Sequence, residues 1–145
     1  MTAEEFLTEE EESRIIKAIQ QAELDTSGEI RVHLESNIEK PSMQHAQEVF
    51  YQIGMQKTKA KNGVLFYVDV TNNVFTILGD KGINETVPDN FWDSIKNNMI
   101  QAFKQEQYTE GLVNGILEVG NKLKQYFPYQ TDDVNELSDE ISKSK

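Results

Sequence analysis

The sequence contains no cysteine, and this absence excludes several kinds of chemistry at once. Without a thiol there is no disulfide bond, no thiolate ligand for a metal and no cysteine nucleophile. Histidine is scarce as well, since the chain has two, His33 and His45, and these do not have the spacing of zinc ligands. Zinc chemistry therefore has no support in the sequence, and the candidate ligands for a metal are oxygen atoms.

Long apolar runs are also missing. No stretch reaches the roughly 18 apolar residues that a membrane-spanning helix needs. Residues 1–12 are acidic, whereas a secretory signal has a basic start followed by an apolar run. We therefore expect a cytoplasmic protein that does not insert directly into a membrane.

Basic residues are outnumbered, with 14 Lys and Arg against 25 Asp and Glu, for a net charge of −11. Such a surface repels nucleic acid and anionic lipid and attracts cations. Two interpretations remain open. The acidity either only keeps the protein in solution or serves to bind a divalent cation.

The length and composition indicate one folded domain. A chain of 145 residues with 37% hydrophobic residues is long enough to bury a core. We assign residues 1–128 to this domain. Residues 129–145 are polar and acidic, and we expect them to form a mobile or loosely docked C-terminal tail.

Periodic patterns predict the secondary structure. Apolar residues at helical spacing predict helices over residues 7–24 and from about 42, 89 and 109 onward, with Thr8, Ser42, Asp89 and Thr109 as their N-caps. Thr8 with Glu11 forms a capping box. Residues 29–36 alternate between apolar and polar, which predicts a strand with one wet face that exposes His33 to solvent.

Two further strands follow the second helix. Residues 64–70 are apolar at nearly every position, which predicts a central strand covered on both faces, and residues 74–78 return as a hairpin. The first and central strands, joined by a helix, are expected to be parallel. The predicted fold class is α/β, a three-layer α/β/α sandwich with a mixed sheet of about four strands flanked by helices.

Known motifs are absent. Residues 69–80 have an acid at each end, but an EF-hand loop needs Gly at its sixth position and Glu at its twelfth, where this chain has Val74 and Asp80. Asp69 lacks the second carboxylate, two residues later, that aspartyl-phosphate phosphatases use. No phosphate-binding glycine loop or nucleophile elbow is present.

One group of acidic residues remains. Asp80, Glu85, Asp89 and Asp93 fall within fourteen positions, across a loop and the start of a helix. The expected topology places Asp80 at the same sheet end as Glu29. Carboxylate oxygens of this kind bind calcium or magnesium. The alternative is that Asp89 only caps its helix while Asp93 is solvated.

Four short blocks in this order resemble the TPM family, named for thylakoid lumen and photosystem repair proteins. They are residues 27–30 (Ser-Gly-Glu-Ile), 62–65 (Asn-Gly-Val-Leu), 79–83 (Gly-Asp-Lys-Gly-Ile) with 87–89 (Val-Pro-Asp), and 103–116, which contains Glu-Gly-Leu-Val. The resemblance implies an α/β/α sandwich and a divalent metal site, with calcium more usual than magnesium. The resemblance implies a role as metal ligands for Asp80 and Asp89, which lie in the matching blocks. The same role for Glu85, Asp93 and Glu29 rests on the expected geometry.

Three functions follow from these observations. The first is a non-catalytic accessory or quality-control domain that binds a divalent cation and an unidentified protein partner. The second is a metal-dependent acid phosphatase, an activity described for plant members of the family, in which Asp80 or Asp89 would orient the attacking water. The third is a metal-free protein-interaction domain, which an exposed apolar patch would indicate.

Overall fold

The computed structural model of the chain describes residues 2–129 and 137–144. Its elements follow in the order α1 (Glu9–Asp25), β1 (Glu29–Glu35), α2 (Ser42–Gln52), the 3-10 turn η1 (Met55–Lys57), β2 (Gly63–Asp69), β3 (Val74–Gly79), α3 (Lys81–Asn84), α4 (Asp93–Lys104), α5 (Tyr108–Leu123) and β4 (Ser142–Lys143).

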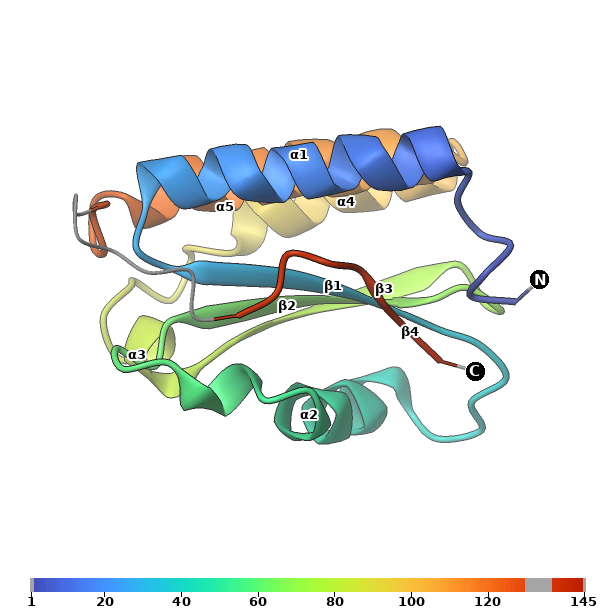
Figure 1. Ribbon diagram of the computed structural model, residues 1–145, viewed down its shortest axis with the longest axis horizontal. Helices are drawn as coiled ribbons and strands as arrows, with labels where there is room; N and C mark the ends of the chain where they lie inside the picture. Colours follow the sequence, from blue (N-terminus) through green and yellow to red (C-terminus); the bar gives the residue numbers. More distant parts are fainter. Residues whose placement is uncertain (1, 130–136, 145) are drawn as a thin grey trace.

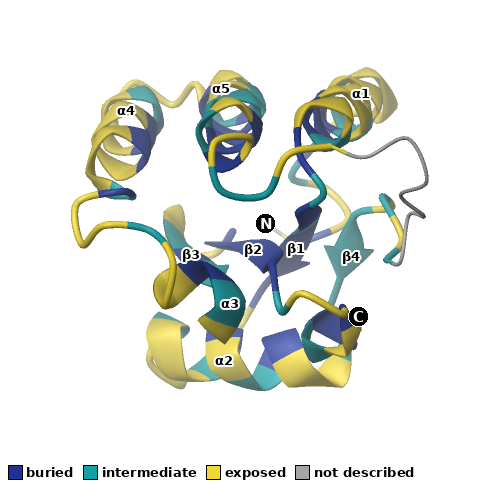
Figure 2. Ribbon diagram, turned by 90° about the vertical axis from the view of Figure 1, so that its left-hand side faces the viewer, coloured by how far each residue is buried: buried dark blue, intermediate teal, exposed yellow. Residues whose placement is uncertain are grey.

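These elements form three layers (Figure 1). The middle layer is a four-stranded sheet in the order β3-β2-β1-β4. Helices α4, α5 and α1 lie side by side over one face, while α2 and α3 cover the other, which we call the α2 face (Figure 2). The predicted α/β/α sandwich with a mixed sheet is confirmed.

The centre of the sheet is β2, all seven residues of which are buried. It pairs in parallel with β1 from Glu29↔Gly63 to Glu35↔Asp69, and antiparallel with β3. Full burial requires cover on both faces, which explains why the strand is almost entirely apolar. The predicted parallel unit and hairpin are confirmed.

The N-terminal helix α1 begins as its sequence predicts. Thr8 and Glu11 form the capping box, each side chain bonding the backbone N–H of the other. The buried side chains of α1, among them Ile15 and Ile19, join the same core as those of α5. The two helices approach closely where Gly120 faces Ala22. The small residues at this point therefore set the distance between the helices.

Three of the predicted caps are wrong. Helix α2 is preceded by Pro41, and no side-chain cap is formed by Ser42. Helix α4 begins at Asp93 after Trp92, because the N–H of Phe91 bonds the carbonyl of Pro88 and closes a turn before the helix. This turn leaves Asp89 exposed and outside the helix. Thr109 lies inside α5, where its hydroxyl donates to Glu11 instead.

The fourth strand comes from the C-terminal segment. Ser142 and Lys143 pair in parallel with His33 and Leu34 of β1. Lys143 also forms ion pairs with Glu4 and Glu12, near the start of α1. Residues 137–144, placed in the tail by the sequence analysis, are thus packed along β1, while residues 130–136 and 145 lie outside the described residues. Within the described residues, no helix is long and apolar enough to cross a membrane.

We predict that Gly120→Ala destabilises the fold. A Cβ at this position would lie 2.7 Å from the Cβ and 2.8 Å from the Cα of Ala22, so α1 and α5 would have to separate. Overpacking of this kind costs about 1–3 kcal/mol, measurable by urea unfolding. The control Asn114→Ala changes an exposed residue of the same helix and should stay within about 0.5 kcal/mol of the parent. Equal stability of Gly120→Ala and the parent would contradict the close approach.

Candidate functional site

The predicted acidic residues are not all neighbours in the fold. Glu29 pairs with Gly63, and the backbone N–H of Asp80 donates to the carbonyl of the same Gly63, at 2.9 Å. Glu29 and Asp80 therefore lie at one end of the sheet, as the predicted topology requires. They stand on opposite sides of β2, roughly 10 Å apart at two strand spacings.

Asp80 is the N-cap of α3. Its Oδ1 accepts a hydrogen bond from the backbone N–H of Lys81 at 2.8 Å, while its Oδ2 is buried without a hydrogen-bond partner. The Oδ1 of Asn62, at the same end of the sheet, is also buried without a partner. Capping accounts for one oxygen of Asp80 and leaves the other available.

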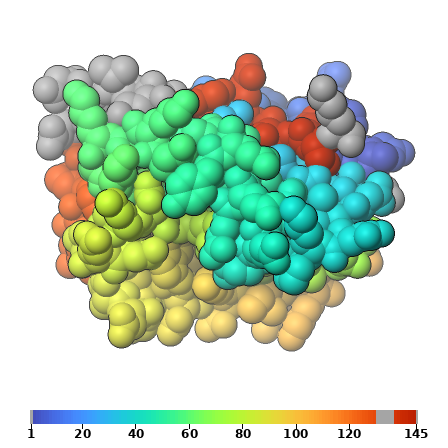
Figure 3. Space-filling view, turned by 90° about the horizontal axis from the view of Figure 1, so that it is seen from below, coloured from blue at the N-terminus to red at the C-terminus, as the bar shows by residue number. Residues whose placement is uncertain are grey.

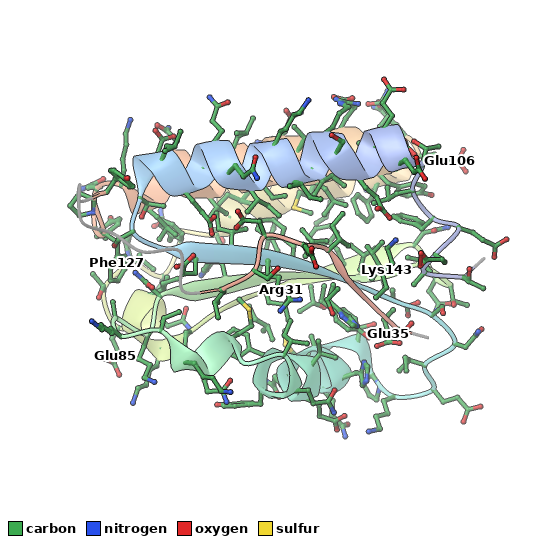
Figure 4. The ribbon with its side chains drawn as sticks, in the orientation of Figure 1. Arg31, Glu35, Glu85, Glu106, Phe127 and Lys143 are labelled. Carbon is green, nitrogen blue, oxygen red and sulfur yellow. The ribbon has the colours of Figure 1, made fainter. Side chains whose placement is uncertain are left out.

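The remaining predicted ligands are solvated. Glu85, Asp89 and Asp93 are all exposed. Glu85 follows α3 and points outward from the end of the molecule (Figure 4). These three residues are therefore not gathered around Asp80 as a closed ligand set.

Glu29 belongs to a different group of acids, which we call the carboxylate triad: Glu23, Glu29 and Asp139. Glu23, near the end of α1, lies within hydrogen-bond reach of both other side chains. Glu29 is 4% exposed, and one oxygen of Asp139 is buried without a partner. Because β4 pairs only with His33 and Leu34, the start of β1 keeps an open outer edge. There Glu23 accepts from the N–H of Ile30 at 3.1 Å.

Like charges at this distance cannot all be ionised in a partly buried place. Burial, followed by the hydrogen bonds from Asp139 and Glu29, holds the pKa of Glu23 well above its ordinary value. The triad thus keeps a proton at neutral pH. As placed, the described residues contain no three His, Asp or Glu side chains arranged to hold a metal ion. In this structure the protonated member of the triad is therefore Glu23.

A second polar cluster lies on the α2 face. His33 bonds Glu35 through Nε2 at 2.9 Å and Ser142 through Nδ1 at 2.8 Å. His45 of α2 bonds the hydroxyl of Tyr67 at 2.8 Å, with its Nδ1 3.6 Å from Glu35. Both histidines of the chain therefore meet at one buried carboxylate.

The predicted exposure of His33 is wrong, since this residue is 5% exposed. Its face is covered by α2 and its edge by β4, a strand whose pairing no local pattern signals. Burial lowers the pKa of His33, against the opposing hydrogen bond of Glu35. A neutral imidazole here donates from Nε2 to the carboxylate and accepts at Nδ1 from the hydroxyl of Ser142.

We predict that His33 makes the protein less stable in mild acid. Because its folded pKa is lowered, the unfolded chain takes up a proton below about pH 6.5 that the folded chain refuses, so stability falls as the pH drops from 7 to 5.5. The slope from this one group is up to about 1.4 kcal/mol per pH unit. In urea unfolding, His33→Gln should lose the part of the pH dependence of the unfolding free energy that comes from His33. The control His45→Gln should retain more of that pH dependence. An unchanged slope in His33→Gln would rule out this assignment.

The chain is similar over 97% of its length, at 50% identity and a TM-score of 0.93, to the BA42 protein from the psychrophilic bacterium Bizionia argentinensis, of which 97% is covered. No curated protein matches.

Two more distant structures share the fold. One is the N-terminal domain of a protein from P. gingivalis, with 22% identity and a TM-score of 0.69, covering 85% of this chain and 80% of that one. The other is the N-terminal domain of the cg2496 protein from Corynebacterium glutamicum, with 16% identity and a TM-score of 0.62, covering 96% and 80%. The family model described as TPM domain matches residues 1–122, and the chain therefore belongs to the TPM domain family.

Proposed function

We propose that this domain binds a divalent cation, calcium in preference to magnesium, at the carboxylate triad, where the ion would displace the proton of Glu23 and draw the three side chains into a ligand arrangement that they do not have as placed, and that it acts as a non-catalytic accessory domain. The observation that carries the proposal is the contact of Glu23 with both Glu29 and Asp139. Three carboxyl groups this close need either a shared proton or a cation between them. Of the five ligands expected from sequence, only Glu29 belongs to this site.

The donor set favours a hard cation. All donor atoms are carboxylate oxygens, and the chain supplies no thiol. Calcium accepts six to eight oxygens in irregular geometry at about 2.3–2.6 Å, whereas magnesium requires a near-ideal octahedron at about 2.0–2.1 Å. Three side chains from a helix, a strand and the C-terminal segment fit the more permissive ion better.

An ion bound at this site would affect how the C-terminal segment is held. Asp139 precedes β4, and its neighbour Glu140 accepts from Arg31 of β1 through its backbone carbonyl, at 3.3 Å. A cation shared between Glu23, Glu29 and Asp139 would therefore fasten the C-terminal segment to α1 and β1. This coupling is the basis for an accessory function, in which the ion controls how firmly that segment is docked.

The phosphatase alternative has less support from the geometry. A phosphate dianion needs fixed cations beside the attacking water. Arg14 pairs with Glu110, and Arg31 bonds Glu140, so both arginines of the chain are engaged away from Asp80. Lys81, next to Asp80, is exposed.

We predict that calcium stabilises the metal-stripped protein more at pH 8 than at pH 5. Folding raises the pKa of Glu23, so the triad costs stability as the pH rises above the ordinary glutamate value, and a cation that replaces the proton removes this cost. At about 100 times its dissociation constant, a ligand adds about 2.7 kcal/mol. Thermal unfolding with added calcium and then magnesium measures the effect.

Two variants make this test specific. Glu23→Gln replaces the protonated carboxyl group with a neutral amide. This variant should abolish both the stabilisation by calcium and the loss of stability as the pH rises. Glu10→Gln makes the same substitution at an exposed position of α1 and should alter neither. Amide NMR shifts at residues 23–30 and 137–144 would support the triad. Saturable shifts confined to residues 80–93 would instead assign the ion to Asp80 and its neighbours and refute the triad.

A further inference from the structure

The side of the sheet opposite the C-terminal segment ends in β3, which has no neighbour on its outer side in the described part of the chain. Figure 2 shows this strand between α4 above and α2 below. A groove of about 450 Å³ runs here, lined by residues of all three elements. Its apolar lining includes Met43, Val74, Phe75, Ile77, Ile100 and Phe103.

Exposed apolar side chains gather at this groove. Six large hydrophobic residues are exposed in the described part of the chain, and three of them line it: Met43 at 49%, Val74 at 43% and Ile100 at 40%. They come from α2, β3 and α4, so the patch spans all three layers. Figure 3 views the molecule from the α2 side, with α2 in teal and α4 in yellow to tan beyond it. A patch built by three separate elements around a free strand edge is typical of an interaction site.

The charge of the groove is opposite to that of the protein. Its charged lining residues are Lys96 and Lys104, and no acid lines it, although the chain carries a net charge of −11. Neither lysine side chain has an ion-pair partner within the described residues. Two unpaired lysines beside an apolar groove are complementary to carboxylates on a ligand.

The spacing of the lysines matches an extended chain. Lys96, Ile100 and Lys104 are four positions apart and lie on one side of α4. Eight helical residues span about 12 Å, which equals about four residues of a strand. Both α4 and β3 extend along the long axis of the molecule (Figure 1). A strand beside β3 would therefore place alternate side chains against lysine, isoleucine and lysine in turn.

We infer that the outer edge of β3 binds an extended peptide segment of a partner protein as a fifth strand, with two acidic side chains four residues apart and an apolar side chain midway between them. The free N–H and C=O groups of the edge strand would pair with the peptide backbone. The apolar side chain would enter the groove beside Ile100, and the carboxylates would pair with Lys96 and Lys104. This site is separate from the proposed cation site and does not depend on it.

A second copy of the chain fits this edge less well. A symmetric contact places the same surface on both sides. Lys96 and Lys104 would then face the same unpaired lysines of the other copy, and two molecules of charge −11 repel each other. The charge pattern favours an acidic segment from a different protein.

The test uses a display library of random nine-residue peptides selected against the full chain. The expected result is enrichment of peptides with two Asp or Glu residues four apart and an apolar residue midway. An enriched peptide, synthesised with capped ends, should shift the amide signals of residues 74–79 and 96–104. Lys96→Glu combined with Lys104→Glu should weaken its binding about tenfold or more, and replacing the two peptide acids with lysine should restore binding to that variant.

The control is Lys17→Glu combined with Lys124→Glu, which changes the net charge equally at exposed lysines outside the groove. Equal weakening by the control would show general electrostatic attraction and overturn the proposal. So would a selection without this pattern, or an enriched peptide that shifts other residues only. Concentration-dependent dimers with shifts in β3, seen without peptide, would assign the edge to a second copy and overturn it as well.

Discussion

The structure depends on how the polar residues of β1 are satisfied after the strand is buried. Glu29, His33 and Glu35 are each at most 5% exposed, and a buried polar group without a partner costs free energy. The C-terminal segment supplies many of the partners. From the start of the strand onward these are Asp139 for the triad, the carbonyl of Glu140 for Arg31, the hydroxyl of Ser142 for His33 and that of Ser144 for the N–H of Ser36. The last residues of the chain thus complete a strand near its beginning.

This dependence explains what the sequence could predict. Local patterns predict the capping box at Thr8, the apolar β2 and the hairpin into β3, because each depends on residues a few positions apart. The pairing of β1 with β4 joins residues 109 positions apart and involves two residues of each strand, too few to leave a periodic signal. The alternating β1 therefore reads as half-exposed, and His33 is placed wrongly. The polar residues on that face were the one feature of the sequence that could have indicated a partner for this strand elsewhere in the chain.

The sequence predicts the candidate site only in part, for the same reason. Topology correctly brought Glu29 and Asp80 to one end of the sheet, because parallel pairing fixes where strands begin. It could not predict that Glu29 meets Glu23 and Asp139 on the outer side of β1, while Asp80 caps α3 on the other side of β2. The two edges of the sheet consequently differ in chemistry. On the outer side of β1 lie the carboxylate triad and the C-terminal segment with β4, whereas the β3 edge is apolar, open and flanked by lysines.

A cation that binds at the triad would take the place of a proton. Calorimetry of calcium binding to the metal-stripped protein at pH 7, repeated in two buffers of different ionisation enthalpy, counts the protons released. We expect saturable binding with release of about one proton, and no release from Glu23→Gln. Calcium binding without proton release, or the same release from Glu23→Gln, would contradict it.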